Sequence, residues 1–323
     1  MHFTIFYLIL GLGLIVIGAD YFIAGSSYIA KRFGVPKLII GLTIVALGTS
    51  APEFAVNIIS SIQGHNQLAM GNVLGSNIAN ILLIFAGAAL FIKTITISKD
   101  SLTQVSLGLL VSIFVIVLCI FSFGLDQSMQ ISQYKGLALL LLGLFYWLYL
   151  YKITKADKER LEVDEIEHNK LQNIKSLGLI IGITLFSLIA LLYGSNLATK
   201  NAVIIAQSLG IPELIIAATI IAIGTSLPEL VTGIQAIRQK QFDLLVGNVV
   251  GSNIINSLFI LGTSALIHSI PVTKDAMNYL AINIIASVLL LVSFTLFNPR
   301  VFKRWQAIVL VIIYIIFLIY TLT

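Results

Sequence analysis

The stretches GLTIVALGTSAPEF (41–54) and GNVLGSNIAN (71–80) occur a second time in this chain, as AATIIAIGTSLPEL (217–230) and GNVVGSNIIN (247–256). The copies align without a gap at an offset of 176 residues, and 24 of 47 positions are identical between 34–80 and 210–256. Each copy places one carboxylate, Glu53 or Glu229, inside an apolar run. An ionisable group in a membrane segment costs roughly 2.5–3.5 kcal/mol on insertion scales and usually marks a functional site. Two of them at matching positions predict one site built from both halves.

The composition indicates an all-α membrane protein. The chain is 58% hydrophobic and 10% charged, against about 25% charged in soluble domains, and its mean hydropathy is +1.03. The net charge of +5 does not indicate nucleic-acid binding, because the basic residues lie between apolar runs and form no stripe with interleaved aromatics. The single cysteine, Cys119, excludes an intrachain disulfide and a cysteine-based metal site.

Apolar runs of about 20 residues predict ten transmembrane helices. They lie near 3–24, 36–62, 67–91, 102–122, 133–151, 176–196, 212–236, 243–267, 277–297 and 305–322. An odd number of spans in each half makes the second half enter the membrane upside down, which is the inverted-repeat plan of secondary transporters. We therefore expect two inverted five-helix repeats, 1–152 and 176–323, joined by a cytoplasmic linker, 153–175.

The basic residues predict the orientation. With both termini outside, the inner loops hold 16 of the 19 Lys and Arg residues, and the outer loops hold only Lys135, Lys200 and Lys274. Cytoplasmic loops carry the excess of positive charge. The opposite orientation would invert this ratio.

The GTSAPE motif predicts that helix 2 is broken. Pro52 has no N–H and opens the turn before it, and Gly48 tolerates unusual dihedral angles. We expect the Thr49 and Ser50 hydroxyls to cap the next half-helix, with main-chain carbonyls splayed near 46–49 and Glu53 on the first turn. Helix 7 repeats this arrangement with Gly224, Thr225, Ser226, Pro228 and Glu229.

These groups favour hard cations. Carbonyls, hydroxyls and carboxylates are oxygen ligands, of which Ca²⁺ takes 6–8. No thiol or mid-span imidazole accompanies them, which argues against zinc or copper.

The second motif adds a polar helix face. Asn72, Ser76 and Asn80 are spaced i, i+4, i+8 and so lie on one face, and Asn248, Ser252 and Asn256 repeat the pattern. GxxxG pairs beside them (Gly71 with Gly75, Gly247 with Gly251) allow another helix to approach closely. The alternative is structural: a Ser or Asn in a membrane helix can serve as an interhelical hydrogen-bond partner, and a lone Glu can be protonated.

The doubled motif, GTSxPE followed by GNxxGSNIxN, resembles the sodium/calcium exchangers of the Ca²⁺:cation antiporter superfamily, in their short prokaryotic form. The resemblance covers nearly the whole chain. It implies a ten-helix fold with central ion sites at which Na⁺ and Ca²⁺ compete. The ligands that it implies are Glu53 and Glu229, Thr49 and Thr225, Ser50 and Ser226, Ser76 and Ser252, Asn80 and Asn256, and the carbonyls of Ala46 and Ala222.

This chain departs at one residue from what the resemblance implies for calcium-selective exchangers. Their second repeat is expected to read GSNxxD, whereas this chain has Asn256 in place of the aspartate. The site then holds two carboxylates, which still balance one Ca²⁺. The coupling ion, a proton-carrying role at this position and selectivity for Ca²⁺ stay open.

The function expected from the sequence is exchange of Na⁺ for Ca²⁺ by alternating access at a midplane site, in the cytoplasmic membrane of a prokaryote. The alternatives are an H⁺- or K⁺-coupled calcium exchanger and a passive cation channel. An intramembrane hydrolase using Ser50 or Ser226 would need a mid-span His or Asp partner, which the sequence lacks, so we expect no enzyme. We expect no cofactor, a monomer, and the lipid bilayer, Na⁺ and Ca²⁺ as the only partners.

The orientation is testable by cysteine labelling. Cysteines introduced into 155–170 are expected to react only with reagents that reach the cytoplasm, and cysteines near Gln127 or His65 only from outside, because of the distribution of basic residues. Labelling in the reverse sense would overturn the orientation. Labelling of all positions from one side would overturn the number of spans.

Overall fold

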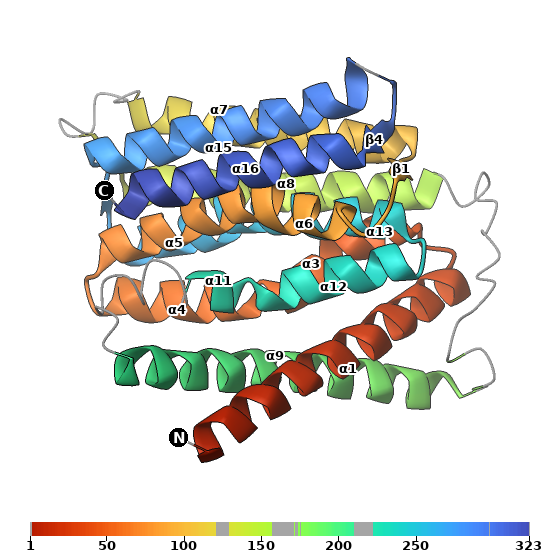
Figure 1. The fold of residues 1–323 in the computed structure, drawn as a ribbon. Coiled ribbons are helices and arrows are strands. Elements are labelled where there is room, and N and C mark those ends of the chain that lie inside the picture. Colours follow the sequence, from red (N-terminus) through yellow and green to blue (C-terminus); the bar gives the residue numbers. More distant parts are fainter. Residues whose placement is uncertain are drawn as a thin grey trace.

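A computed structural model describes residues 2–120, 129–156, 171, 174, 176–209, 222–296 and 298–322. Long helices run side by side, with short strands at their ends (Figure 1). In the first part of the chain the elements are α1 (His2–Phe33), α2 (Lys37–Ile40), η1 (Gly41–Val45), α3 (Ala46–Thr49), α4 (Ala51–Ile62), α5 (Asn66–Ala79), η2 (Asn80–Phe85), α6 (Ala86–Ala89), β1 (Thr94–Thr96), α7 (Lys99–Ile120), β2 (Gln130–Ile131) and α8 (Gln133–Ala156). The second part forms α9 (Leu177–Ser208), α11 (Ala222–Thr225), α12 (Leu227–Arg238), α13 (Phe242–Ile255), η5 (Asn256–Ile260), α14 (Leu261–Ile267), β3 (Ile270–Pro271), α15 (Lys274–Thr295), β4 (Val301–Lys303) and α16 (Arg304–Leu322).

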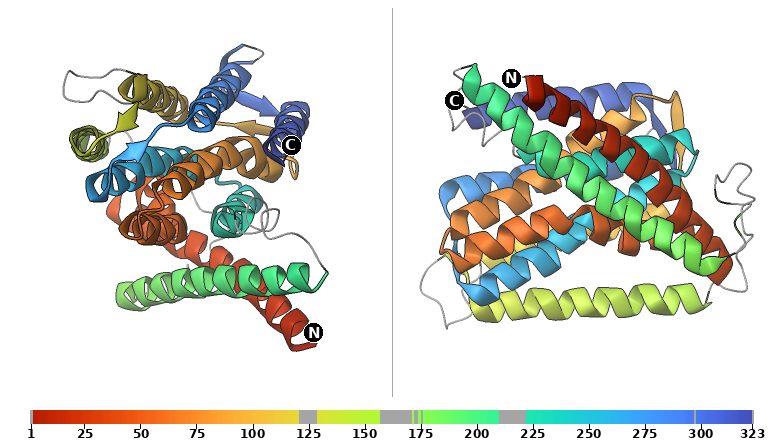
Figure 2. Two further views of the ribbon diagram at one scale, coloured as in Figure 1. Left: turned by 90° about the vertical axis from the view of Figure 1, so that its left-hand side faces the viewer. Right: turned by 90° about the horizontal axis from the view of Figure 1, so that it is seen from below.

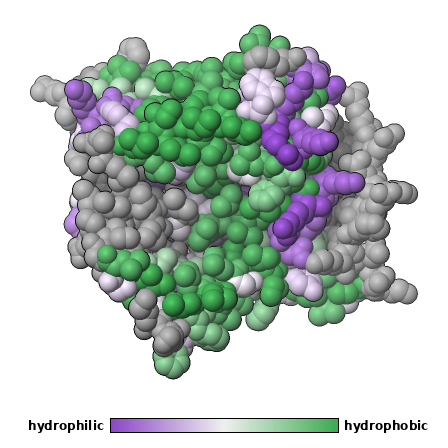
Figure 3. Space-filling view, in the orientation of Figure 1, coloured by the Kyte–Doolittle hydropathy of each residue, from purple (hydrophilic) through white to green (hydrophobic). Residues whose placement is uncertain are grey.

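The helices confirm an all-α membrane protein. Within the described residues, eight are long and apolar enough to cross a membrane, and a bent pair, 38–49 with 51–62, makes a ninth span. The expected span at 212–236 begins in 210–221, outside the described residues, and its described part is α11 and α12. Large apolar side chains are exposed on the outward faces of several helices, among them Phe6, Phe145, Phe186 and Ile316. Figure 3 shows this apolar surface, with hydrophilic residues gathered at the right-hand side and a smaller group at the upper left.

Helices α1 and α9 are longer than the sequence predicts. Each has 32 residues, which is ~48 Å at 1.5 Å per residue and exceeds the ~30 Å hydrocarbon layer. They cross each other beside the other helices (Figure 2), and such tilting accommodates the extra length. The expected end of the first helix near residue 24 is wrong because Ser26 and Ser27 are buried and the helix continues until Gly34, whose φ is 63°.

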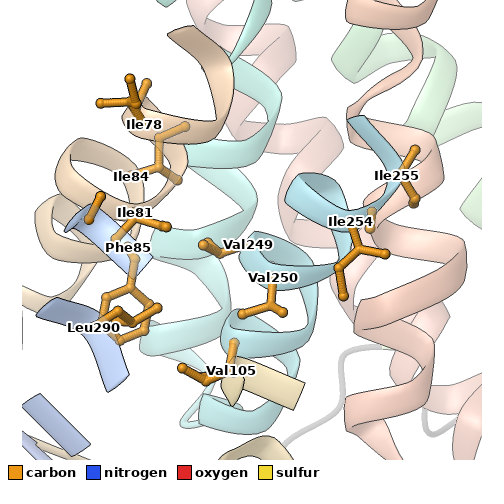
Figure 4. Packing of buried hydrophobic residues seen from close by; sticks show 14 of the residues in the cluster. Ile78, Ile81, Ile84, Phe85, Val105, Val249, Val250, Ile254, Ile255 and Leu290 are labelled. Carbon is orange, nitrogen blue, oxygen red and sulfur yellow. The ribbon is translucent and has the colours of Figure 1, made fainter. Parts of the chain in front are cut away.

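Two helical segments form the centre of the molecule, and both carry the repeated GNxxGSN motif. Within an 18-residue apolar stretch of each span, 94% is buried in Phe242–Ile267 and 78% in Ala69–Ala89, against 22% in Phe3–Ile29. Figure 4 shows apolar side chains of these segments, such as Ile81, Phe85, Val250 and Ile254, packed together with Val105 and Leu290. The motif helices therefore sit in protein, away from lipid.

Two small antiparallel ribbons, which the sequence did not predict, join distant parts of the chain. Strand β1 pairs with β4, with Thr94 opposite Lys303, and β2 pairs with β3, with Gln130 opposite Pro271. The ribbons lie at opposite ends of the helices (Figures 1 and 2). Each connects a segment before residue 132 with one after residue 269.

Helix α13 packs against α2 and η1 through its glycines. A Cβ atom added at Gly247 would lie 2.6 Å from the Leu38 carbonyl oxygen, and one at Gly251 would lie 2.8 Å from Leu42 Cα. The expected close approach is therefore confirmed for the second GxxxG pair. Around Gly71 and Gly75 no described atom lies within 4 Å of an added Cβ, and 214–221, the counterpart of 38–45, lies outside the described residues.

This contact gives a stability prediction. Gly247→Ala is expected to lower the thermal unfolding midpoint of the purified protein, because the clash with main-chain atoms outweighs the gain of about 1 kcal/mol in helix propensity. Gly13→Ala is the matched control, since Gly13 has open space around it. An unfolding midpoint for Gly247→Ala equal to or above that of the control would contradict this packing.

Candidate functional site

Both copies of the GTSxPE motif form a break between two helices. Helix α3 ends at Thr49 and α4 begins at Ala51, and the two segments are bent by 50°. Between them Ser50 has φ −80° and ψ 7°. Ser226 has nearly the same dihedral angles, φ −92° and ψ 7°, between α11 and α12. A proline in the first turn of each following helix accounts for the break, so the predicted breaks are confirmed.

The two breaks exchange hydrogen bonds across the halves. Ser226 Oγ donates to Glu53 Oε1 at 3.1 Å, and Ser50 Oγ donates to Glu229 Oε1 at 3.2 Å. Both carboxylates are 1% exposed. Each one is thus held by the hydroxyl of the opposite repeat.

The predicted capping role of Ser50 is therefore wrong. Neither Ser50 nor Ser226 makes a side-chain capping hydrogen bond to its own helix. A hydrogen bond to an ionised carboxylate is stronger than one to a main-chain amide, and such an acceptor lies within reach only because the two halves fold together.

The carboxylates lack a positive partner within the described residues. Glu53 and Glu229 are close enough to interact electrostatically, and neither interacts with a cationic side chain. Their second oxygens, Glu53 Oε2 and Glu229 Oε2, have no hydrogen-bond partner in the part of the chain that the structure describes. Two buried like charges repel each other, and a bound cation would offset both.

The threonines of the motif lie beside the same groups. Thr49 Oγ1 donates to Asn248 Oδ1 at 3.1 Å, and Asn248 Nδ2 donates to Thr232 Oγ1 at 3.1 Å. Thr49 also interacts electrostatically with Glu229, as Thr225 does with Glu53. Asn248 is thus hydrogen-bonded, while Asn72 is half-buried and its Nδ2 has no partner among the described residues.

The Ala46 carbonyl stays in the helical ladder. It accepts from Ser50 N at 3.0 Å and from Thr49 Oγ1 at 3.4 Å. The predicted splayed carbonyl is therefore not present at this position. Ser50, at the break itself, still donates its N–H to Ala46, and the missing N–H of Pro52 removes the helical partner of Gly48 instead. Ala222 is the first residue of α11.

The last asparagine of each GNxxGSN motif begins a π-helical turn. Asn80 starts η2 and Asn256 starts η5, at the same 176-residue offset as the sequence repeat. Short π-helical segments inside α-helices occur frequently at functional sites. Here η2 packs against α12, the helix of Glu229, and η5 packs against α4, the helix of Glu53. Both asparagines are 1% exposed.

The candidate ligands share unpaired oxygens. Besides the two carboxylate oxygens, Asn80 Oδ1, Asn256 Oδ1 and Ser252 Oγ are buried and find no hydrogen-bond partner in the described ranges. Ser76 is also buried. Buried polar atoms are rarely left unpaired, and each one requires an explanation. Three or more His, Cys, Asp or Glu side chains do not gather anywhere in the described residues. The buried unpaired atoms named here are all oxygens, the ligand type that hard cations prefer.

Sequence reasoning missed several buried polar residues. The buried face of α4 consists of Glu53, Asn57, Ser60 and Ser61, and no apolar residue of this helix is buried. The middle asparagines of the two motifs, Asn77 and Asn253, hydrogen-bond to each other's main chain. Their matching places in both copies were the available signal.

Comparison with known proteins assigns the chain to a family. The pattern of the family described as "Sodium/calcium exchanger protein" matches residues 3–152 and 179–323. The inner membrane protein YrbG of Escherichia coli is 37% identical over 88% of this chain and 85% of its own length. The sodium/calcium exchanger MaX1 of Methanosarcina acetivorans is 32% identical over 98% of both chains.

A solved structure agrees with the fold. The sodium–calcium exchanger NCX_Mj, soaked with Na⁺ and Ca²⁺, superposes with a TM-score of 0.81 at 30% identity, over 97% of each chain. This likeness extends over nearly the full length and includes both copies of the repeated motif. The chain therefore belongs to the sodium/calcium exchanger family.

Proposed function

We propose that this protein is a secondary antiporter that exchanges Na⁺ for Ca²⁺. The observation that carries the proposal is the crossed pair in which Ser50 Oγ donates to Glu229 and Ser226 Oγ donates to Glu53. These hydrogen bonds bring two buried carboxylates together where the halves meet. The two negative charges of the ionised carboxylates would balance one Ca²⁺. Relatives named as sodium/calcium exchangers support the choice of ions.

The ligands that we propose are oxygens from both halves. They are the side chains of Glu53, Glu229, Thr49, Thr225, Ser50, Ser226, Ser76, Ser252, Asn80 and Asn256, with the carbonyls of Ala46 and Ala222. The Ala46 carbonyl accepts two hydrogen bonds in this conformation and would bind an ion only on release from them. The unpaired oxygens of the two glutamates, the two asparagines and Ser252 support this set. Ca²⁺ or Na⁺ would replace their missing hydrogen bonds with cation–oxygen contacts.

The site requires alternating access because its carboxylates are buried. One cation load neutralises the pair, and the neutral site can then be exposed to the other side of the membrane. The unloaded site holds two uncompensated charges, whose burial is costly. This cost would couple the outward movement of one ion to the inward movement of the other.

The proposed architecture has ten spans in two inverted repeats, 1–152 and 176–323, with 153–175 as a cytoplasmic linker. Three observations support it: the matched breaks at Ser50 and Ser226, the π-helical turns at equal offset, and the ribbons at opposite ends. Both termini would lie outside the cytoplasmic membrane of a prokaryote. The bacterial relative YrbG is named as an inner membrane protein.

A second candidate, an H⁺- or K⁺-coupled calcium exchanger, is favoured by Asn256. This neutral residue stands where the resemblance to calcium-selective exchangers implies a third carboxylate. Uptake of ⁴⁵Ca²⁺ into proteoliposomes distinguishes the candidates. We expect an outward Na⁺ gradient to drive uptake, and K⁺ or H⁺ gradients to be ineffective. Uptake driven only by K⁺ or H⁺ would overturn Na⁺ coupling, and flux that does not respond to the ion on the other side would indicate a channel.

The two carboxylates give a second prediction. Glu53→Gln and Glu229→Gln are each expected to abolish Na⁺-driven ⁴⁵Ca²⁺ uptake with expression and folding retained, because the site then lacks one charge for Ca²⁺. Asp275→Asn, at an exposed carboxylate in the first turn of α15, is the control for loss of a negative charge and should transport normally. Uptake at the wild-type rate by either glutamine variant would contradict the two-carboxylate site.

A further inference from the structure

An amide network joins the two central helices beside the candidate site. Asn253 Nδ2 donates to the main-chain oxygen of Asn77 at 3.1 Å, and Asn77 Nδ2 faces the main-chain oxygen of Asn253 at 3.5 Å. Asn77 Nδ2 also donates to Ser257 Oγ at 2.9 Å. The middle asparagine of each repeat thus reaches the main chain of the other repeat.

These contacts determine which end of each carboxamide points where. A main-chain carbonyl oxygen can only accept a hydrogen bond, so the amide end that faces it must be the NH₂ group. The oxygen of each middle asparagine then points the other way. Asn253 Oδ1 accepts from Asn80 Nδ2 at 2.9 Å, and Asn77 Oδ1 accepts from Asn256 Nδ2 at 3.1 Å.

The orientation of the last asparagine of each motif follows in the same way. Asn80 and Asn256 use their NH₂ groups in the network, so their oxygens are the free ends. Asn80 Oδ1 and Asn256 Oδ1 are both buried and have no hydrogen-bond partner among the described residues. With the carboxamide turned by 180°, each residue would instead present N–H groups, which repel a cation.

We propose that Asn77 and Asn253 are positioning residues for cation binding, which orient the carboxamides of Asn256 and Asn80 so that oxygen faces the ion. The inference rests on the proposed cation site and adds the residues that determine which end of each carboxamide faces the cation. It also gives a physical reason for Asn256. An aspartate there has an oxygen in place of Nδ2, and that oxygen would face Asn77 Oδ1, so two acceptors would meet without a proton between them. The network of this chain is matched to an asparagine.

The test measures ion affinity separately from stability. Purified full-length wild type, Asn77→Ser and Asn253→Ser are titrated with CaCl₂ and with NaCl, and the thermal unfolding midpoint is followed, because an ion that binds the folded state raises it. We expect both variants to need roughly tenfold or more Ca²⁺ for the same upward shift, the size of one lost interaction with a charged group. Asn283→Ser is the matched control: Asn283 is a buried asparagine of α15 that donates to Ser112 Oγ.

Double variants distinguish positioning from general damage. On an Asn256→Ala background, Asn77→Ser should cause no further loss of affinity, since the oxygen that it orients is gone, whereas Asn253→Ser should still weaken binding. On an Asn80→Ala background the roles reverse. Contacting residues show such non-additivity, and independent residues do not. Ser257→Ala is a milder substitution on the Asn77 arm, and its smaller loss of affinity should also vanish with Asn256→Ala.

Each result has one meaning. Weakened affinity with this pattern of non-additivity supports the proposal. Variants that lower the ion-free unfolding midpoint but keep wild-type affinity, or effects that add on every background, overturn it. A wild-type protein whose unfolding midpoint responds to neither ion overturns the proposed function itself.

Discussion

Two buried carboxylates, with no positive side chain beside them among the described residues, are the constraint on which the rest of this structure depends. Glu53 and Glu229 are each 1% exposed, and the hydroxyl that holds each one belongs to the other repeat. Unpaired buried charge is strongly unfavourable. The serine hydroxyls reduce this cost only in part, because one oxygen of each carboxylate has no hydrogen-bond partner within the residues that the structure describes. In the proposed function, a bound cation offsets the rest of this cost.

The surrounding helices bring neutral oxygen donors to this pair. Helix α13 can approach α2 and η1 because Gly247 and Gly251 have no side chain at the contact, and this approach places Asn248 within hydrogen-bonding distance of Thr49. The π-helical turns begin at Asn80 and Asn256, next to the helices of the opposite glutamates. Every layer of the site therefore combines one element from each half.

The sequence was most informative where the repeat imposes matched chemistry. The glutamates, the breaks at Ser50 and Ser226, and the terminal asparagines could be predicted, because residues of these types are costly in an apolar segment and recur together. The contacts between the halves could not be predicted. Ser50 was expected to cap its own helix because only its local neighbours are visible in the sequence, and its true acceptor is 179 positions away. Asn77 was overlooked because a polar residue one step from Ser76 lies off the expected face. The length of α1 was underestimated because buried and exposed serines look the same in a sequence.

The two ribbons have a consequence for how the protein is made. Strand β1 leaves the ribosome early, but its partner β4 lies at 301–303, close to the end of the chain. Strand β2 likewise waits for β3 at 270–271. The helices between them must enter the bilayer before either ribbon can close, so insertion and final packing are separate stages. Translation must pass residue 303 before the last of these pairings forms, and until then β1 has no partner strand.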